Sequence, residues 1–298
     1  MTNILDKLST EKRNLETENL DKLSTLEMVT LMNNEDKKVS AAIERVLPDI
    51  ALGVDAIAEA FQMGGRLIYT GAGTSGRLGI LDASECPPTF GTEPEMVVGI
   101  IAGGLKAMTK AVEKSEDNFE AGCEDLKKIK LSSKDIVCGI SASGRTPYVK
   151  GGLKYAREIN CKTIAISNNL NAEISQYGDI KIEVDCGPEI LTGSTRLKSG
   201  TAQKMVLNML TTLSMVKIGK VYKNLMVDVK ATNEKLVERT KKIVMEATNC
   251  NYKTAEEILK ITNFNVKVAI VMIILNCNYD EAKNRIDNSK GYIRKAIQ

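Results

Sequence analysis

The hydrophobic positions of residues 1–65 recur at the spacing of amphipathic helices. The clearest run lies in residues 40–63, where apolar side chains fall mostly three or four positions apart and predict one helix (Ile43, Val46, Leu47, Ile50, Val54, Ile57 and Phe61). Ser24 and Glu27 form the pattern of a capping box, which predicts a helix start upstream of this run. The glycine pair at 64–65 predicts its end.

Beyond residue 65 the pattern changes to short apolar runs that alternate with helical ones. The runs that predict strands are residues 67–70, 96–101, 136–140, 163–166 and 181–185. The stretches that predict helices are one that starts at about Leu78, Leu105–Phe119, 147–159 and 199–221. Buried strands that alternate with helices are typical of a parallel sheet covered by helices on both faces. The sequence therefore predicts an α/β fold.

The last part of the chain is helical and charged, and it contains a weak repeat. The letters NCNY occur at 249–252 and again at 276–279, which predicts two short helical hairpins of one kind. We therefore expect three parts: an N-terminal helical segment (1–44), a sheet domain (45–222) and a small helical C-terminal domain (223–298). The C-terminal domain contains no grouping of residues that suggests catalysis.

The composition excludes several kinds of chemistry. The 298 residues include no histidine, so Ser-His-Asp and Cys-His catalysis and histidine metal sites are ruled out. Proton transfer in an enzyme would then fall to Glu, Asp, Lys, Tyr or Cys. There is no tryptophan, and 41 Lys and Arg against 38 Asp and Glu leave a formal charge of +3. Neither feature favours nucleic acid or an anionic membrane as a partner.

The cysteines and the apolar runs indicate the compartment. Seven cysteines are an odd number and none forms a C-x-x-C pair, so neither a disulfide framework nor a zinc site is expected. Residues 1–10 lack the apolar stretch of a signal peptide. The longest apolar run, 268–275, is far too short to span a bilayer. These features favour a cytoplasmic protein.

Three turns that precede predicted helices are rich in glycine and hydroxyl side chains. They are GAGTSG at 71–76, SASGRT at 141–146 and GSTRLKSG at 193–200. Glycine lets backbone N–H groups approach an anion, and a helix N-terminus favours negative charge. Turns after parallel strands meet at one edge of the sheet, which predicts a pocket for a phosphomonoester. The candidate ligands are Gly73, Thr74, Ser75, Gly76, Ser141, Ser143, Thr146, Ser194, Thr195 and Lys198.

The first turn also matches the dinucleotide-binding pattern G-x-G-x-x-G. That pattern needs an acidic residue at the end of the next strand. Here the next strand ends in IIAGG at 100–104, so a nicotinamide cofactor is disfavoured. Glycine and hydroxyl residues are also common in turns for structural reasons alone. A purely structural role becomes less plausible when similar turns follow two separate strands.

The motifs resemble a known family. GAGTSGRL at 71–78 and SASGRTP at 141–147 resemble the sugar isomerase (SIS) fold, a phosphosugar-binding α/β domain. LDASECPPT at 81–89, TEKRN at 10–14 and LTGSTRLK at 191–198 are similar to one branch of it, the N-acetylmuramic acid 6-phosphate etherases. The resemblance covers nearly the whole chain. One departure is Leu15, where the branch is expected to have proline.

This resemblance implies a reaction and its catalytic residues. The branch cleaves the ether between D-lactate and C3 of an N-acetyl sugar 6-phosphate, without a metal or redox cofactor, when cell-wall sugar is reused. The implied route is elimination from the open-chain aldehyde followed by addition of water. By resemblance Glu85 protonates the departing oxygen and Glu116 is the second acid/base, although which glutamate has which role stays open. A homodimer is also implied, and the apolar helix at 205–218 suits burial in one.

The residues by themselves leave alternatives open. Glu116 lies among Glu113, Asp117 and Glu120, where an acidic helix face exposed to solvent is a simpler interpretation. A catalytically silent phosphosugar sensor would need neither Glu85 nor Glu116. An aldose–ketose phosphosugar isomerase would use a carboxylate base but would not need SECPPT at 84–89. Lactate release, ketose formation and binding without turnover separate these hypotheses.

Overall fold

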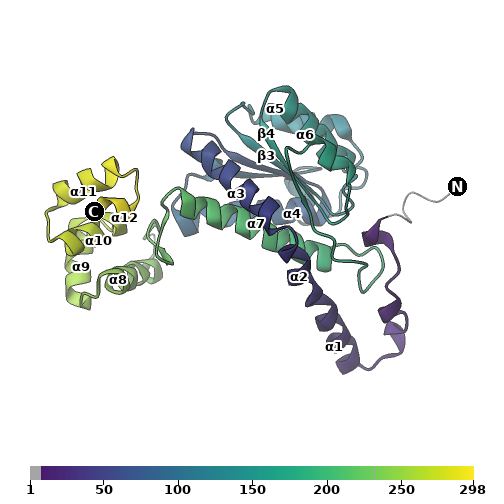
Figure 1. The fold of residues 1–298 in the computed structure, drawn as a ribbon, viewed down its shortest axis with the longest axis horizontal. Helices are drawn as coiled ribbons and strands as arrows, with labels where there is room; N and C mark the ends of the chain where they lie inside the picture. Colours follow the sequence, from purple (N-terminus) through teal and green to yellow (C-terminus); the bar gives the residue numbers. More distant parts are fainter. Residues whose placement is uncertain (1–7, 232) are drawn as a thin grey trace. The chain divides into compact units, whose positions relative to one another are not determined.

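A five-stranded parallel sheet organises the first part of the structure, a computed structural model that describes residues 8–231 and 233–298 (Figure 1). The strand order is β2-β1-β3-β4-β5, and all the neighbouring strands pair in parallel. The strands are β1 (Leu67–Gly71), β2 (Val97–Ile101), β3 (Ile136–Ser141), β4 (Lys162–Ser167) and β5 (Ile180–Glu183). The five apolar runs and the α/β fold that they predicted are confirmed.

Helices cover both faces of this sheet, as the apolar strands on each side require. One face carries α5 (Phe119–Lys128) and α6 (Pro147–Glu158), whose buried side chains join those of Ile68 and Val137. The opposite face carries α3 (Leu47–Gln62), α4 (Gly73–Phe90) and α7 (Lys198–Lys217) (Figure 1). Short 3-10 helices connect these elements: η5 (Pro94–Met96), η6 (Leu105–Met108) and η7 (Glu173–Tyr177).

The described residues fall into two structural units. The first contains residues 8–84 and Glu95–Thr211, and the second contains Glu85–Pro94 and Thr212–Gln298 apart from position 232. The boundaries therefore lie inside α4, η5 and α7. The three-part division expected at residues 44 and 222 stays a prediction.

The N-terminal segment is less regular than the hydrophobic pattern predicted. Before α1 the described residues form three 3-10 turns, η2 (Ser9–Glu11), η3 (Leu15–Thr17) and η4 (Leu20–Lys22), and polar side chains there make buried hydrogen bonds. Thr17 Oγ1 donates to the Ile190 carbonyl at 2.9 Å, and Asn169 Nδ2 donates to Thr10 Oγ1 at 3.0 Å. Residues 1–7, which the pattern assigned to the same helical segment, lie outside the described residues.

The helix expected over residues 40–63 is interrupted. After α1 (Thr25–Asp36), whose Ser24 and Glu27 capping box is confirmed, α2 (Lys38–Glu44) ends before α3 begins at Leu47. Pro48 lies in the first turn of α3. Proline has no N–H to donate and its ring collides with the carbonyl four residues earlier, so the chain stops one helix and starts another.

The helix expected at Leu105–Phe119 was wrong. Only η6 forms, and the chain then runs as a loop to α5. Lys114 has a φ of 61°, a left-handed conformation that a right-handed helix cannot contain. Val112 also folds back against Gly103, where a Cβ would lie 3.0 Å from the Val112 Cβ. This long-range contact overrides the helical pattern.

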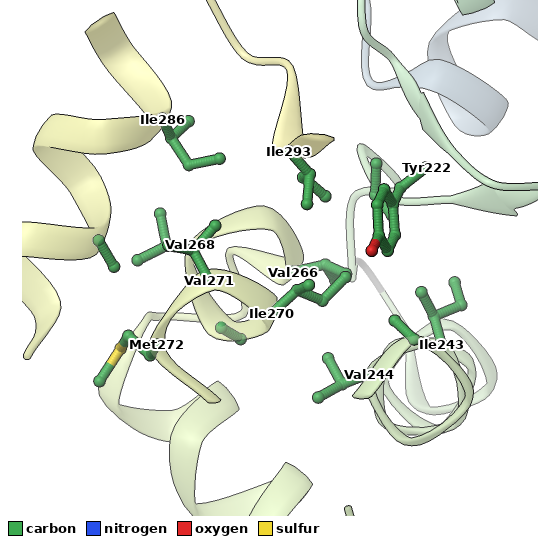
Figure 2. Packing of buried hydrophobic residues seen from close by; sticks show 14 of the residues in the cluster. Tyr222, Ile243, Val244, Val266, Val268, Ile270, Val271, Met272, Ile286 and Ile293 are labelled. Carbon is green, nitrogen blue, oxygen red and sulfur yellow. The ribbon is translucent and has the colours of Figure 1, made fainter. Parts of the chain in front are cut away.

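The C-terminal helices bury a core of their own. They are α8 (Glu234–Thr248), α9 (Tyr252–Ile261), α10 (Val266–Leu275), α11 (Tyr279–Asn288) and α12 (Ile293–Ala296), after an antiparallel pair β6 (Val221–Tyr222) and β7 (Leu225–Met226). Figure 2 shows Val268 and Ile270 of α10 at the centre, with Val244 of α8 on one side and Ile286 of α11 on the other. Apart from Lys267, all the residues of α10 are apolar, and residues 266–272 are buried among the neighbouring helices.

The NCNY repeat marks the same helix junction twice. Asn249 ends α8 at φ 60° and Asn276 ends α10 at φ 48°, both left-handed. Two residues later, the side chains of Asn251 and Asn278 cap α9 and α11. The predicted repetition of one hairpin design is therefore confirmed, since asparagine suits both positions.

Candidate functional site

The first glycine-rich turn joins β1 to α4. The helix starts at Gly73 rather than near Leu78, so Thr74, Ser75 and Gly76 lie in its first turn. A Cβ on Gly76 would lie 2.7 Å from the Gly71 carbonyl oxygen and 2.6 Å from Ile101 Cγ1. These glycines therefore let the start of the helix pack directly against the end of the strand.

The second turn gathers its hydroxyl groups into one cluster after β3. Ser141 Oγ lies 2.8 Å from Thr146 Oγ1 and 3.4 Å from Ser143 Oγ. The N–H of Gly144, which has a φ of 70°, donates to Ser141 Oγ at 3.0 Å. Ser143 and Thr146 are half-buried, and α6 starts directly after Thr146. Hydroxyls and the N-terminus of α6 thus favour an anion here.

The third turn lies beside the first. A Cβ on Gly200 would lie 3.5 Å from Thr74 Cγ2, which places the first turn of α7 against the first turn of α4. Ser75 Oγ donates to Gln203 Oε1 of α7 at 2.9 Å. Ser194 and Thr195 are half-buried in the loop just before α7. The structure therefore brings the first and third turns together.

Lys198 is placed differently from the other candidates. Its ammonium group is buried and lies 2.5 Å from Glu35 Oε2 of α1. Its backbone N–H donates to Glu189 Oε2 at 2.9 Å, and the N–H of Ser199 donates to Glu189 Oε1 at 2.9 Å. Thus both the side chain and the amide of this phosphate-ligand candidate have protein partners.

Sequence reasoning missed the amide side chains that connect the turns. Gln203 Nε2 donates to Asn168 Oδ1 at 2.9 Å, and Asn169 Nδ2 donates to the Ala142 carbonyl at 3.0 Å. Asn168 and Asn169 follow β4 directly, at the same sheet edge as the turns after β1 and β3. That position was the available signal, because polar residues after parallel strands meet at one edge.

Glu116 lies next to two of the turns. It is exposed in the loop before α5, and its carbonyl accepts the N–H of Tyr148 in the first turn of α6 at 3.0 Å. It also lines a cavity of about 240 Å³ together with Gly73 and Arg77 of α4. Arg77 Nε donates to the carbonyls of Ala107 and Met108. These bonds hold Arg77 against Ala107, which also lines the cavity. A carboxylate here borders a space for a small molecule.

Glu85 is exposed on α4 and belongs to the second unit. From the sequence, Glu85 is expected after the helix that follows the first turn, just before Pro87 and Pro88, and this expectation is wrong. Instead α4 includes both prolines and ends at Phe90, before Gly91 with a φ of 60°, whose N–H donates to the Pro87 carbonyl at 2.9 Å. The pairing of Glu85 with Glu116 stays a prediction.

Cations near the second turn are already paired. Arg145 Nε lies 2.7 Å from Glu173 Oε1, and Lys150 Nζ lies 2.8 Å from Glu173 Oε2.

Among residues 8–231 and 233–298, no group of three or more His, Cys, Asp and Glu is arranged to hold a metal ion. In the same ranges no single helix is both long and apolar enough to cross a membrane, although α9 and α10, bent by 118°, pass that test as a pair.

The fold and the hydroxyl turns define a SIS-domain protein. A SIS domain model matches residues 120–213, and a model of the glucokinase regulatory protein N-terminal SIS domain matches residues 49–157. A phosphoheptose isomerase from Francisella tularensis shares this fold with a TM-score of 0.51 and 16% identity. That match covers 65% of this chain and 98% of the isomerase.

Curated relatives match almost the whole chain. N-acetylmuramic acid 6-phosphate etherase 2 of Lactiplantibacillus plantarum is 59% identical over 98% of this chain and 99% of its own. N-acetylmuramic acid 6-phosphate etherase of Geobacillus sp. strain WCH70 is 58% identical over 99% of this chain and 100% of its own. The chain belongs to the N-acetylmuramic acid 6-phosphate etherase family, which confirms the resemblance inferred from the motifs.

Proposed function

We propose that this protein cleaves the D-lactyl ether of N-acetylmuramic acid 6-phosphate to give N-acetylglucosamine 6-phosphate and D-lactate. The observation that carries this proposal is the identity of 58–59% over nearly full length with relatives that bear the name of this activity. The cluster of hydroxyl turns at one sheet edge supports it, because a sugar phosphate needs such a site.

The phosphate would be held by the turns at the starts of α4 and α6 and before α7. Their backbone N–H groups and hydroxyls donate hydrogen bonds, and the helix N-termini favour a dianion. Ser141, Ser143 and Thr146 support this role because their hydroxyls already converge. Thr74, Ser194 and Thr195 are half-buried around the neighbouring first and third turns and would complete the set.

The reaction needs one carboxylate base and one carboxylic acid. The base removes the C2 proton, which is acidic because it lies next to the aldehyde of the open-chain sugar. The electron pair forms the C2–C3 double bond, the C3–O bond breaks, and the acid protonates the departing lactate oxygen. Water then adds to C3 while a proton returns to C2. We propose Glu116 as the C2 base, supported by the cavity that it lines, and Glu85 as the acid.

Purified protein incubated with N-acetylmuramic acid 6-phosphate should release lactate. In water labelled with heavy oxygen, elimination and addition should place the label on the C3 hydroxyl of the sugar product. Label in the lactate would instead indicate attack on the lactyl carbon and would contradict the route. Absence of lactate would contradict the activity itself.

Glu85→Gln and Glu116→Gln should each lower kcat by about 100-fold or more, because a positioned acid or base contributes about that much. The matched controls are Glu93→Gln, which is also exposed and belongs to the second unit, and Glu120→Gln, which is exposed in the first turn of α5 and does not line the cavity. Both controls should keep kcat within about twofold. Full activity in either catalytic variant would remove that residue from the mechanism.

We also propose that the enzyme works in the cytoplasm as a homodimer. The cysteines of the described residues are free thiols, which suits a reducing compartment. Large apolar side chains remain exposed on α3 and α7, among them Leu52, Leu213 and Val216, and a second subunit would cover such side chains. Light scattering should give twice the chain mass of 32.5 kDa, and the mass of a single chain would contradict the dimer.

A further inference from the structure

One ion pair lies in the interior beside the proposed phosphate site. Lys198 Nζ and Glu35 Oε2 are 2.5 Å apart, and each side chain is 2% exposed. Lys38 Nζ lies 2.6 Å from the other carboxylate oxygen of Glu35 and 2.8 Å from Glu16 Oε2. Glu35 thus joins the first residue of α7 to the N-terminal helices.

A buried pair of charges is an expensive way to stabilise a fold. Removing both groups from water costs about as much as their attraction returns, and apolar side chains of similar size often serve as well. What such a pair does provide is a fixed geometry, because neither charge tolerates losing its partner. The pair therefore calls for a role beyond stability.

The ion pair holds an element on which the hydroxyl turns depend. The N–H groups of Lys198 and Ser199 donate to the buried carboxylate of Glu189, so the start of α7 is fixed from two sides. Ser194 and Thr195 lie in the loop immediately before it. Gly200 packs beside Thr74, and Gln203 accepts from Ser75. A shift of the first turns of α7 would therefore displace hydroxyls in two turns.

We propose that Lys198 is a positioning residue, which fixes the start of α7 through Glu35 and so holds the first and third hydroxyl turns in place for the sugar phosphate. Lys198 then acts on the substrate without touching it, in contrast to the direct phosphate contact expected from the sequence. The buried position of its ammonium supports this, because a phosphate in an open turn would not reach it. The inference rests on the proposed function.

The test compares Glu35→Gln, Lys198→Met and the double variant, with Lys154→Met of an exposed pair on α6 as the control. The probe is N-acetylglucosamine 6-phosphate, titrated by calorimetry, with lactate release measured in parallel. Each single variant should weaken Kd and raise KM by about tenfold, while kcat changes less than about twofold. The double variant should resemble the single ones, because both substitutions break the same link.

Other results would overturn the proposal. If Lys198 contacts phosphate directly, Lys198→Met should lose binding while Glu35→Gln keeps or improves it. A merely structural pair would lower Tm but leave Kd and KM of the folded protein unchanged. If the single variants do not fold, the exchanged pair Glu35→Lys with Lys198→Glu decides: binding within about threefold of the original supports positioning, and lost binding in a folded protein overturns it. If the original protein binds the probe but releases no lactate, the proposed function fails separately.

Discussion

Single contacts decide how closely the elements around the site approach one another. Gly71 and Gly76 meet where β1 ends and α4 begins, and backbone atoms occupy the space that side chains would need. Asp82, further along α4, accepts hydrogen bonds from Tyr69 Oη at 3.0 Å and Asn208 Nδ2 at 2.7 Å. Burial raises the pKa of Asp82 above its usual range despite these bonds. The close contact of Gly71 with Gly76 and the hydrogen bonds of Asp82 both hold α4 in place.

Gly76→Ala should destabilise the protein by about 1–3 kcal/mol and reduce phosphosugar binding. The added Cβ would lie 2.7 Å from the Gly71 carbonyl oxygen, and the backbone of β1 cannot move without disturbing the sheet. Gly152→Ala on α6 is the control, because its Cβ would meet only ordinary contacts at 3.4 Å or more. Equal unfolding midpoints in denaturant for the two variants would contradict this account.

Glu35→Gln should alter the acid stability of the protein. Burial alone would raise the pKa of Glu35, but hydrogen bonds from Lys198 and Lys38 lower it from 4.5 to about 2. A lowered pKa contributes stability above pH 4.5 that is lost as the pH falls towards 2. The original protein should therefore lose Tm over this window, and the variant should lose less, starting from a stability lower by about 3 kcal/mol. Parallel Tm curves from about pH 6 to about pH 2 would refute this.

At the scale of elements, the hydrophobic pattern predicted the strands correctly because each is a short apolar run between turn residues. It failed for residues 40–63 and 105–119. Pro48 divides the first stretch, and in the second the contact of Val112 with Gly103 competes with helix formation. The second error bears on the candidate site, because it moves Glu116 from a helix to a loop. Lys114, two residues before Glu116, has the positive φ that excludes the helix.

The left-handed ends of α8 and α10 can be tested at Asn276. Its φ of 48° is unfavourable for most residues, but asparagine tolerates it and glycine accepts it without strain. Asn276→Ala should therefore lower the free energy of unfolding by about 1 kcal/mol, whereas Asn276→Gly should change it by less than about 0.5 kcal/mol. Denaturant titration monitored by circular dichroism measures both. An alanine variant as stable as the glycine variant would rule out this role for the conformation.

At the scale of the whole molecule, burial sorts the cysteines into two groups. Cys86, Cys138, Cys161 and Cys186 are buried, whereas Cys123, Cys250 and Cys277 are half-buried. Burial raises the pKa of Cys161 and of Cys186 to about 12, so these thiols form little of the reactive thiolate at neutral pH. The fold therefore buries four of the seven cysteine thiols away from oxidants in solvent.

Thiol titration with dithionitrobenzoate at mildly alkaline pH should distinguish the half-buried from the buried cysteines by their rates of reaction. The half-buried thiols should react first and the buried ones only after a denaturant is added, giving seven thiols in all. Fewer than seven thiols in denaturant without reductant would indicate a disulfide. Fast reaction of all thiols in the native protein would contradict the described burial.

The sequence by itself determined the alternating strands and helices, the glycine and hydroxyl turns, the repeated C-terminal hairpin and the family, because these are recorded in local order and spacing. Only the tertiary structure decided which distant groups meet: Glu35 with Lys198, Glu189 with the start of α7, and Asn168 with Gln203. A charged or amide side chain looks the same in a sequence whether solvent or a distant partner satisfies it. The folded structure determines which partner such a side chain contacts, and a side chain that is already bonded to a buried partner is not free to bind a ligand.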